Sequence, residues 1–177
     1  MISFITGNKN KFAEAEAILG LPLVQQPLDL EEIQGSLEEI AKHKCILAAE
    51  LTNGPVLVED SALEFTAWGT LPGPYIKWFY NSLGNEGLCT ALKGFQDHSA
   101  TSVCTYAYSR GPGSEPILFQ GRVKGTIVSP RGKNGFAFDP IFEVDGQTYA
   151  EMEPDVKNAL SERYLALMEF KRWITKV

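Results

Sequence analysis

The sequence predicts an α/β protein with a mixed, largely antiparallel sheet flanked by helices. Two observations support this prediction. Strand-like and helix-like segments alternate over the first third of the chain, and most of the second half has strand-like patterns that one C-terminal helix closes. The same pattern is compatible with an arrangement in two lobes.

The first third of the chain begins with strand, helix, strand and loop. Residues 2–6 are a short apolar run that predicts a strand, and the segment before Gly20 has apolar residues at helical spacing. Residues 23–26 predict a second strand, and residues 27–35 predict an acidic loop.

The clearest helix begins at Ser36, which forms a capping box with Glu39. Its apolar stripe continues to Leu51, and Asn53-Gly54-Pro55 ends it. The run Val56-Leu57-Val58 then predicts a buried strand with acidic residues at its carboxyl end.

The second half contains the remaining strands. Residues 71–74 predict a tight turn before the aromatic segment 75–80, in which Trp78, Phe79 and Tyr80 suit either a dimer interface or core packing. Further elements are predicted for the following ranges: strands at 102–109 and 117–128, a type I′ hairpin that pairs 142–144 with 147–150, and a final helix over 161–175.

Composition limits the class of protein. The 177 residues are 44% hydrophobic and 21% charged, without repeats or a linker-like stretch, so we expect one domain over 1–177. The net charge of −6 argues against nucleic-acid and anionic-membrane partners. Three widely spaced cysteines indicate reduced thiols, and no apolar run of membrane-spanning length occurs, so we expect a soluble, cytoplasmic protein.

Two lysines, Lys9 and Lys11, begin a predicted helix, where the macrodipole favours anions. Bound phosphate would resolve that conflict, and solvated lysines are the ordinary alternative. Lys44 lies within the apolar stripe of the second helix. Its ammonium therefore needs a carboxylate or a phosphate as partner, unless it reaches solvent at the edge of the stripe.

Glu59 and Asp60 follow the predicted strand 56–58, where open α/β sheets bind ligands. Paired carboxylates suit Mg²⁺, which binds a few carboxylates together with substrate phosphates. Glu31 or Glu32 could add a ligand from the acidic loop, although carboxylates in this position commonly form turns or caps.

The glycine-rich, basic segment 130–140 leads into Phe136 and Phe138, which would share one face of an extended chain and could stack a base, with Asp139 as a hydrogen-bond acceptor or a metal ligand. Core packing is the common alternative for both rings. Lys157 and Arg163 add cations near the start of the last helix. Cations, paired carboxylates and aromatic rings together fit a nucleoside triphosphate with Mg²⁺.

Several motifs resemble the inosine triphosphate pyrophosphatases, which hydrolyse non-standard purine nucleoside triphosphates. The matching blocks are Thr6-Gly7-Asn8 with Lys11, residues 58–63, residues 71–79, Gly125-Thr126-Ile127 with Pro130-Arg131-Gly132, residues 136–140, and Lys157-Asn158 with Ser161 and Arg163.

The resemblance implies an elongated fold with a central substrate cleft between two lobes, and a homodimer. It also implies conversion of ITP, dITP or XTP to the monophosphate and pyrophosphate with Mg²⁺, or Mn²⁺ in its place, which cleanses the nucleotide pool. The implied metal ligands are Glu32 and Asp60. The catalytic residues that we expect from this chemistry are Asp60, Lys11 and Lys44. The implied substrate-binding residues are Thr6, Gly7, Asn8, Lys9, Asn10, Lys11, Lys44, Asp60, Ser61, Phe136, Ala137, Phe138, Asp139, Lys157, Glu162 and Arg163.

Three positions differ from the family pattern, which usually has Gly at Ala137, Tyr or Trp at Phe138, and His at Glu162. A carboxylate at Glu162 could restrain Arg163, accept the N1–H of a purine, or cap the helix. Asp60 is the first candidate for the base that activates water, and Glu59 the second. A pyrophosphatase of broader specificity and a purine-nucleotide sensor without turnover remain as alternative functions.

Overall fold

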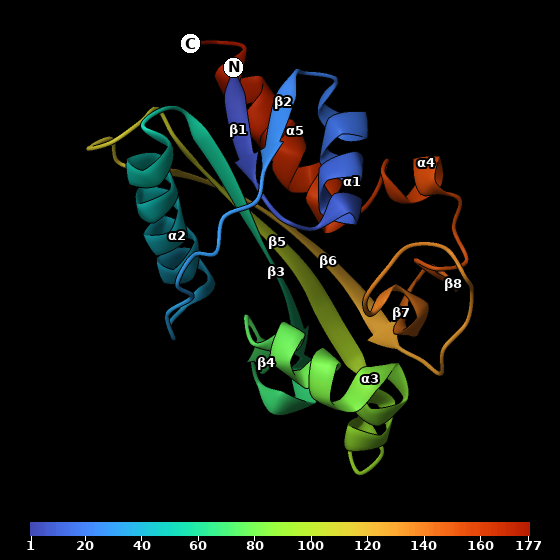
Figure 1. Ribbon diagram of the computed structural model, residues 1–177. Coiled ribbons are helices and arrows are strands. Elements are labelled where there is room, and N and C mark those ends of the chain that lie inside the picture. The colour runs from blue at the N-terminus through green and yellow to red at the C-terminus, as the bar shows by residue number, and fades with distance from the viewer. The chain divides into compact units, whose positions relative to one another are not determined.

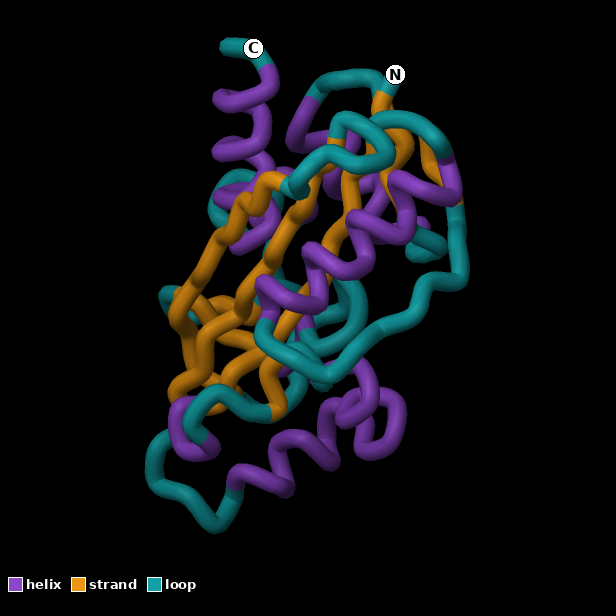
Figure 2. The backbone as a smooth tube through the Cα atoms, turned by 90° about the vertical axis from the view of Figure 1, so that its left-hand side faces the viewer, coloured by secondary structure: helices purple, strands orange, loops and turns teal.

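The sheet has eight strands and is mostly antiparallel, as the sequence predicted, in a computed structural model that describes all 177 residues (Figure 1). Its strand order is β2-β1-β3-β5-β6-β7-β8, and β4 pairs with β3. β1 pairs in parallel with both β2 and β3. The strands are β1 (Ile2–Ile5), β2 (Leu23–Gln26), β3 (Val56–Phe65), β4 (Pro72–Gly73), β5 (Ser99–Ser109), β6 (Ile117–Ile127), β7 (Phe142–Val144) and β8 (Gln147–Thr148). The longer strands lie side by side in Figure 2.

Five α-helices accompany the sheet, and none is long and apolar enough to cross a membrane. They are α1 (Lys9–Leu19), α2 (Leu37–Thr52), α3 (Ile76–Leu92), α4 (Pro154–Lys157) and α5 (Glu162–Ile174), and the 3₁₀ turns are η1 (Thr66–Trp68) and η2 (Asp139–Ile141).

The chain forms two compact units. The first unit comprises Met1–Asp60, Cys104–Gly121 and Glu162–Val177, and the second comprises Ser61–Val103 and Arg122–Ser161. β3, β5 and β6 each contribute residues to both units.

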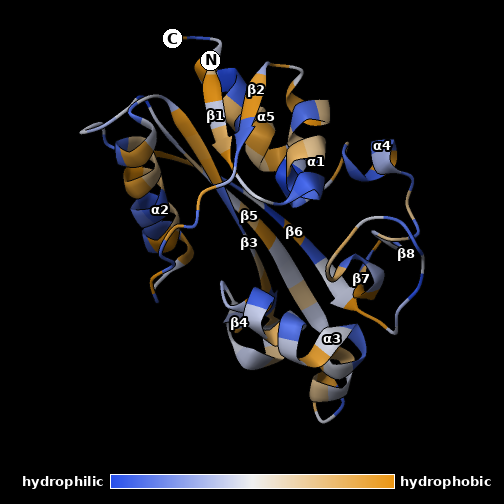
Figure 3. Cartoon of the chain, viewed as in Figure 1, coloured by the Kyte–Doolittle hydropathy of each residue, from blue (hydrophilic) through white to orange (hydrophobic).

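The core of the first unit follows the alternation of side chains along its strands. Phe4, Leu57 and Tyr106 pack with α1 and α5. Their neighbours Ile5 and Val58 pack with α2 instead. Two helices therefore cover one face of the sheet, and α2 covers the other. In Figure 3, β1 is mainly hydrophobic, whereas α2 carries both hydrophobic and hydrophilic residues, as expected for a helix with one buried face.

The core of the second unit joins β3, β5 and β6 residues to α3 and to the segment after β6. The sequence assigned no element to the aromatic segment, which begins α3. Phe79 and Tyr80 pack partly against this core, whereas Trp78 is 61% exposed. α3 is interrupted at Gly84, whose φ of 67° and ψ of 179° are not helical.

Several sequence predictions are confirmed locally. Ser36 caps α2 by accepting a hydrogen bond from the Glu39 N–H, and the hairpin residues Asp145 and Gly146 have the positive φ of a type I′ turn. Leu51 was wrongly placed in the buried stripe of α2, because it lies in the last turn and is 66% exposed. The short helix α4 was also not predicted.

β3 is longer than predicted, and this corrects the position of the acidic residues. The strand continues from Val56 to Phe65, so Glu59, Asp60 and Ser61 lie within it and not after it. Its parallel neighbour β1 pairs only as far as Ile5 with Val58. The carboxylates therefore lie just beyond the end of β1.

Gly121→Ala should destabilise the protein. Gly121 lies on β6 against the first turn of α5, and a methyl group there would overlap the carbonyl oxygen of Glu162 and the backbone nitrogen of Ala166. Overpacking of this kind costs about 1–3 kcal/mol, which lowers Tm by roughly 2–10 °C for a chain of this size. Gly94→Ala, where the new methyl group meets nothing within 4 Å, should leave Tm within about 2 °C. Equal Tm values for the two variants in thermal denaturation would contradict this packing.

Candidate active site

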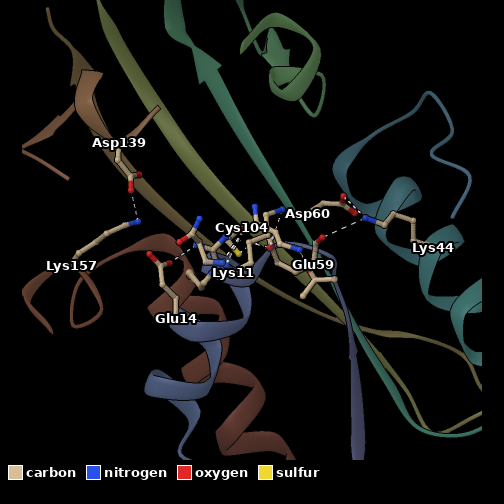
Figure 4. A network of polar contacts seen from close by, with 12 residues as sticks. Lys11, Glu14, Lys44, Glu59, Asp60, Cys104, Asp139 and Lys157 are labelled. Carbon is tan, nitrogen blue, oxygen red and sulfur yellow. Dashed lines mark hydrogen bonds and ion pairs between the residues drawn. The ribbon is translucent and has the colours of Figure 1, made fainter. Parts of the chain in front are cut away.

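Adjacent residues of β3 face opposite sides of the sheet, and this positions the two central carboxylates. Leu57 packs with α1 and α5, and Val58 packs with α2. With a period of two, Glu59 faces α1 and α5, and Asp60 faces α2. Their ion pairs agree, because Glu59 contacts residues of α1 and α5 and Asp60 contacts a residue of α2. Figure 4 shows both carboxylates and their lysine partners.

Glu59 is the hub of the contacts on the α1 and α5 face. Its side chain is fully buried, and Oε2 lies 3.2 Å from Lys11 Nζ and 3.3 Å from Arg163 Nη2. The Cys104 thiol donates to Oε1 over 3.5 Å, and burial raises the pKa of this thiol far above its usual value. Two cationic partners offset the cost of burying this carboxylate.

Arg163 is the main cation of this cluster. It lies in the first turn of α5 and is buried, and its guanidinium donates to Glu14 of α1 as well as to Glu59. Burial alone would lower the pKa of Arg163, but the nearby anionic groups, with Glu59 the strongest, raise it well above its usual value. Glu14 and Glu59 therefore hold a permanently charged guanidinium inside the protein.

Lys44 occupies the other face. Its Nζ lies 2.8 Å from Asp60 Oδ1, 3.6 Å from Glu32 Oε1 and 3.5 Å from the Glu59 carbonyl oxygen. Burial acts to lower the pKa of Lys44, but attraction to Asp60, Glu32 and Glu59 outweighs it, so the pKa is raised. The lysine on the apolar stripe thus has the carboxylate partners that its position requires.

Asp60 has one carboxylate oxygen without a protein partner. Oδ2 is buried and accepts no hydrogen bond, while Oδ1 binds Lys44. Burial raises the pKa of Asp60 most strongly, the charge of Glu59 adds to this, and Lys44 and Lys11 oppose it. An orphaned buried carboxylate oxygen is costly for a protein unless something else binds it.

This arrangement fits Mg²⁺ with substrate better than a metal held by protein alone. Glu32 and Asp60 both contact Lys44, so their carboxylates converge on one place. No group of three or more His, Cys, Asp and Glu side chains suited to a metal ion occurs in the structure. Mg²⁺ typically takes one or two protein carboxylates and completes its shell with water and phosphate oxygens. Glu31 does not join these ligands, because it pairs with His43 over 3.5 Å.

The start of α1 differs from a bare phosphate-binding helix terminus. The Asn8 side chain caps the helix by accepting hydrogen bonds from the backbone N–H groups of Asn10 and Lys11. The backbone N–H of Asn8 donates to Thr6 Oγ1. Two of the N–H groups are therefore already used within the protein. The conflict between Lys11 and the helix dipole is relieved by Glu59, whereas Gly7 and Lys9 are exposed.

The second unit holds its own cluster. Lys157 Nζ lies 2.7 Å from Asp139 Oδ2, and both side chains are buried. The same oxygen accepts from the Phe136 N–H over 2.9 Å. The Lys157 ammonium also lies 4.9 Å from the centroid of the Phe136 ring and 5.5 Å from that of Tyr149. These contacts join two of the predicted nucleoside-binding segments.

The expectation that Phe136 and Phe138 share one face of an extended segment is wrong. Ala137 between them has a φ of 52°, and the segment is a turn leading into η2. Phe138 is 7% exposed and packs edge-on against Phe142 in the core, whereas Phe136 is half-buried. Phe138 therefore anchors the turn, and Phe136 is the better candidate for stacking.

The remaining predicted residues are distributed between the units. Ser61 is half-buried on β3 in the second unit, and Glu162 is buried at the start of α5 in the first. Sequence reasoning missed Glu14 and understated Glu59. Glu14 lies three residues after Lys11, so both side chains lie on one face of the helix. This spacing could have indicated that Glu14 belongs to the same charged cluster.

The fold and these clusters define a mixed α/β protein whose first unit places lysine and arginine cations beside buried and half-buried carboxylates. A model of the Ham1 family matches residues 2–173, and the chain belongs to this family.

Relatives cover nearly the whole chain. The inosine triphosphate pyrophosphatase of Emericella nidulans is 58% identical over 175 residues, which are 98% of this chain and 96% of that protein. The enzyme of the same name from Ajellomyces capsulatus is 54% identical over 177 residues, with 99% and 97% covered.

Solved structures agree in fold. The HAM1 protein of Coxiella burnetii has a TM-score of 0.89 at 31% identity and covers 99% of this chain and 98% of its own. The nucleoside-triphosphatase or dITP/XTP pyrophosphatase of Mycobacterium abscessus has a TM-score of 0.74 at 27% identity, with 96% and 97% covered.

Glu59→Gln should strongly destabilise the protein, because it removes a buried charge that two cations need. Breaking one side of a buried ion pair costs about 3–5 kcal/mol. Glu169→Gln is the control, since Glu169 pairs with Arg172 at the exposed end of α5 and such pairs contribute about 0–1 kcal/mol. Urea denaturation measures both free energies of unfolding, and a loss below about 1 kcal/mol for Glu59→Gln would refute the hub role.

Proposed function

We propose that this protein hydrolyses non-standard purine nucleoside triphosphates, namely ITP, dITP and XTP, to the nucleoside monophosphate and pyrophosphate in an Mg²⁺-dependent reaction. Membership of the Ham1 family and the names of the relatives support the reaction class. The observation that carries the proposal is the buried Oδ2 of Asp60, without a partner beside Lys44 and Glu32.

The first unit supplies the groups that a triphosphate needs. Lys11 and Lys44 would neutralise phosphate charge as it develops in the transition state. Glu32 and Asp60 would hold Mg²⁺, with Mn²⁺ as an alternative ion. When bound, the metal ion supplies Lewis-acid stabilisation of phosphate oxygens.

Asp60 is the preferred group for orienting the attacking water and accepting its proton. Asp60 has a buried carboxylate oxygen, Oδ2, without a protein partner, whereas the Glu59 carboxylate is occupied by Lys11 and Arg163. Water attacks the α-phosphorus, the bond from that phosphorus to the bridging oxygen breaks, and pyrophosphate leaves with that oxygen. The products are a nucleoside monophosphate and pyrophosphate.

We assign base recognition to the nucleoside-binding residues that the sequence predicts. Phe136, Asp139 and Lys157 would contact the nucleoside. Arg163 would donate to the six-keto oxygen of hypoxanthine or xanthine, where adenine carries an amino group. A buried donor without its acceptor costs about 1–3 kcal/mol or more, which disfavours ATP. Glu162 would adjust this preference through its carboxylate, and the protein would act as a cytoplasmic homodimer that cleanses the nucleotide pool.

A screen of pyrophosphate release tests the function directly. Purified protein is incubated with ITP, dITP, XTP, GTP, ATP and pyrimidine triphosphates, in Mg²⁺ and in excess EDTA. We expect release from ITP, dITP and XTP with Mg²⁺ and none with EDTA. Equal rates on all purines would favour a pyrophosphatase of broader specificity, and nucleotide binding without release would favour a sensor. Hydrolysis of ATP as fast as ITP would refute the role of Arg163.

Two substitutions test the catalytic residues against matched controls. Asp60→Asn and Lys44→Ala should each lower kcat/KM for ITP by roughly 10²-fold or more, because a water-activating base and a phosphate-neutralising cation are removed. Two variants serve as controls and should retain activity. Asp29→Asn changes an exposed residue of the loop before α2, and Lys42→Ala changes an exposed lysine on α2, the helix that carries Lys44. Wild-type rates for Asp60→Asn would show that another group activates the water.

A further inference from the structure

The turn over residues 135–139 is fastened at its ends by its own contacts. Asp139 Oδ2 accepts from the Phe136 N–H and binds Lys157, and the Asp139 N–H donates to the Phe136 carbonyl oxygen over 3.1 Å. A side chain at Gly135, which has a φ of 73°, would collide with the Asp139 carboxylate. These hydrogen bonds join the backbone of Phe136 to Asp139, so the position of the Phe136 ring depends on the position of the Asp139 carboxylate.

The middle of this turn is held from α3, more than 50 residues away in the sequence. Asn85 Nδ2 donates to the carbonyl oxygen of Ala137 over 3.0 Å. Ala137 has a φ of 52°, a conformation that residues other than glycine, Asn and Asp rarely adopt. The hydrogen bond fixes the peptide group next to this strained residue. It therefore opposes relaxation of the turn.

Asn85 itself carries an unmet polar group. Its Oδ1 is buried and has no hydrogen-bond partner, although its Nδ2 is used. Such a group is destabilising, and an apolar side chain would fill the same space without that cost. The reverse amide orientation would place two acceptor oxygens against each other. What the Asn85 side chain provides is therefore the donor to Ala137.

The break in α3 gives Asn85 its position. Gly84 has a φ of 67° and a ψ of 179°, so α3 stops and restarts, and Asn85 is the first residue after the break. A continuous helix would rotate the following residues to other directions. The two unusual backbone conformations, at Gly84 and at Ala137, are connected by one hydrogen bond.

We propose that Asn85 is a positioning residue for purine binding: through the Ala137 carbonyl it holds the turn that presents Phe136 and Asp139 to the base. This assignment rests on the proposed function. It accounts for an Ala at a φ of 52°, because the hydrogen bond stabilises a conformation that glycine would adopt without help.

Asn85→Ala should raise KM for ITP about tenfold while kcat stays within about twofold, because the base is bound less well and the reacting phosphates are untouched. Inhibition by inorganic tripolyphosphate, which has no base, should be unchanged. Asn81→Ala, an exposed asparagine one turn earlier on α3, should match wild type in all three quantities. If Asn85→Ala does not fold, the nearly isosteric Asn85→Asp also removes the donor and should show the same rise in KM.

A rescue experiment separates this role from general damage. In the Asn85→Ala, Ala137→Gly double variant, glycine adopts the required φ without strain, and KM should return to within about threefold of wild type. An unchanged KM in Asn85→Ala, an equal loss of tripolyphosphate inhibition, or no rescue by glycine would each overturn the assignment. A wild-type protein that hydrolyses no purine triphosphate would overturn the proposed function, and the assignment with it.

Discussion

The first unit depends on the buried carboxylate of Glu59. Because side chains alternate along β3, the next residue, Asp60, faces the other side of the sheet. Glu59 is fully buried, yet Lys11 and Arg163 lie within 3.3 Å of its Oε2. An uncompensated charge at that depth would cost several kcal/mol, so α1 and α5 must deliver their cations to this place for the unit to fold. The same alternation directs Asp60 to α2 and Lys44. The charged side chains that stabilise the first unit are therefore also those to which we assign the chemistry.

This charge balance explains how an acidic protein can receive a polyanion. The net charge of −6 is that of the whole chain, but the cations Lys44 and Arg163 are each held by nearby carboxylates. Binding of a metal ion by Asp60 and Glu32 would compete with Lys44 for them and leave its ammonium available to phosphate. The resting ion pairs keep these charges stable until ligand arrives.

Much of the site could be predicted because it breaks local rules of sequence. Lys44 on an apolar stripe demanded a charged partner, and the structure gives it Asp60 and Glu32. The position of Glu59 within β3 could not be predicted, because its burial depends on helices that are distant in the sequence. Strand length was misjudged because acidic residues are poor strand formers, and here ion pairs outweigh that propensity.

The second unit shows what local patterns leave out. The α3 segment was assigned no element, although Ile76, Phe79, Tyr80 and Leu83 recur at helical spacing before the break at Gly84. Position 137 of the turn over residues 135–139 is an alanine with a positive φ, and its conformation is supported by a contact from α3 that only the tertiary structure shows. Phe138 packs in the core against Phe142, a contact that its sequence neighbourhood does not show. Family membership supplies the reaction class, and these residues give it a physical basis in this chain.

We propose that Asp60 joins metal ion and triphosphate in one site. Calorimetric titration with a non-hydrolysable α,β-imido analogue of ITP, with and without Mg²⁺, measures this without turnover. We predict that wild type binds the analogue at least tenfold more tightly with Mg²⁺, and that Asp60→Asn loses this difference while it keeps the wild-type Tm within about 3 °C. Equal Mg²⁺ dependence in wild type and Asp60→Asn would contradict the account.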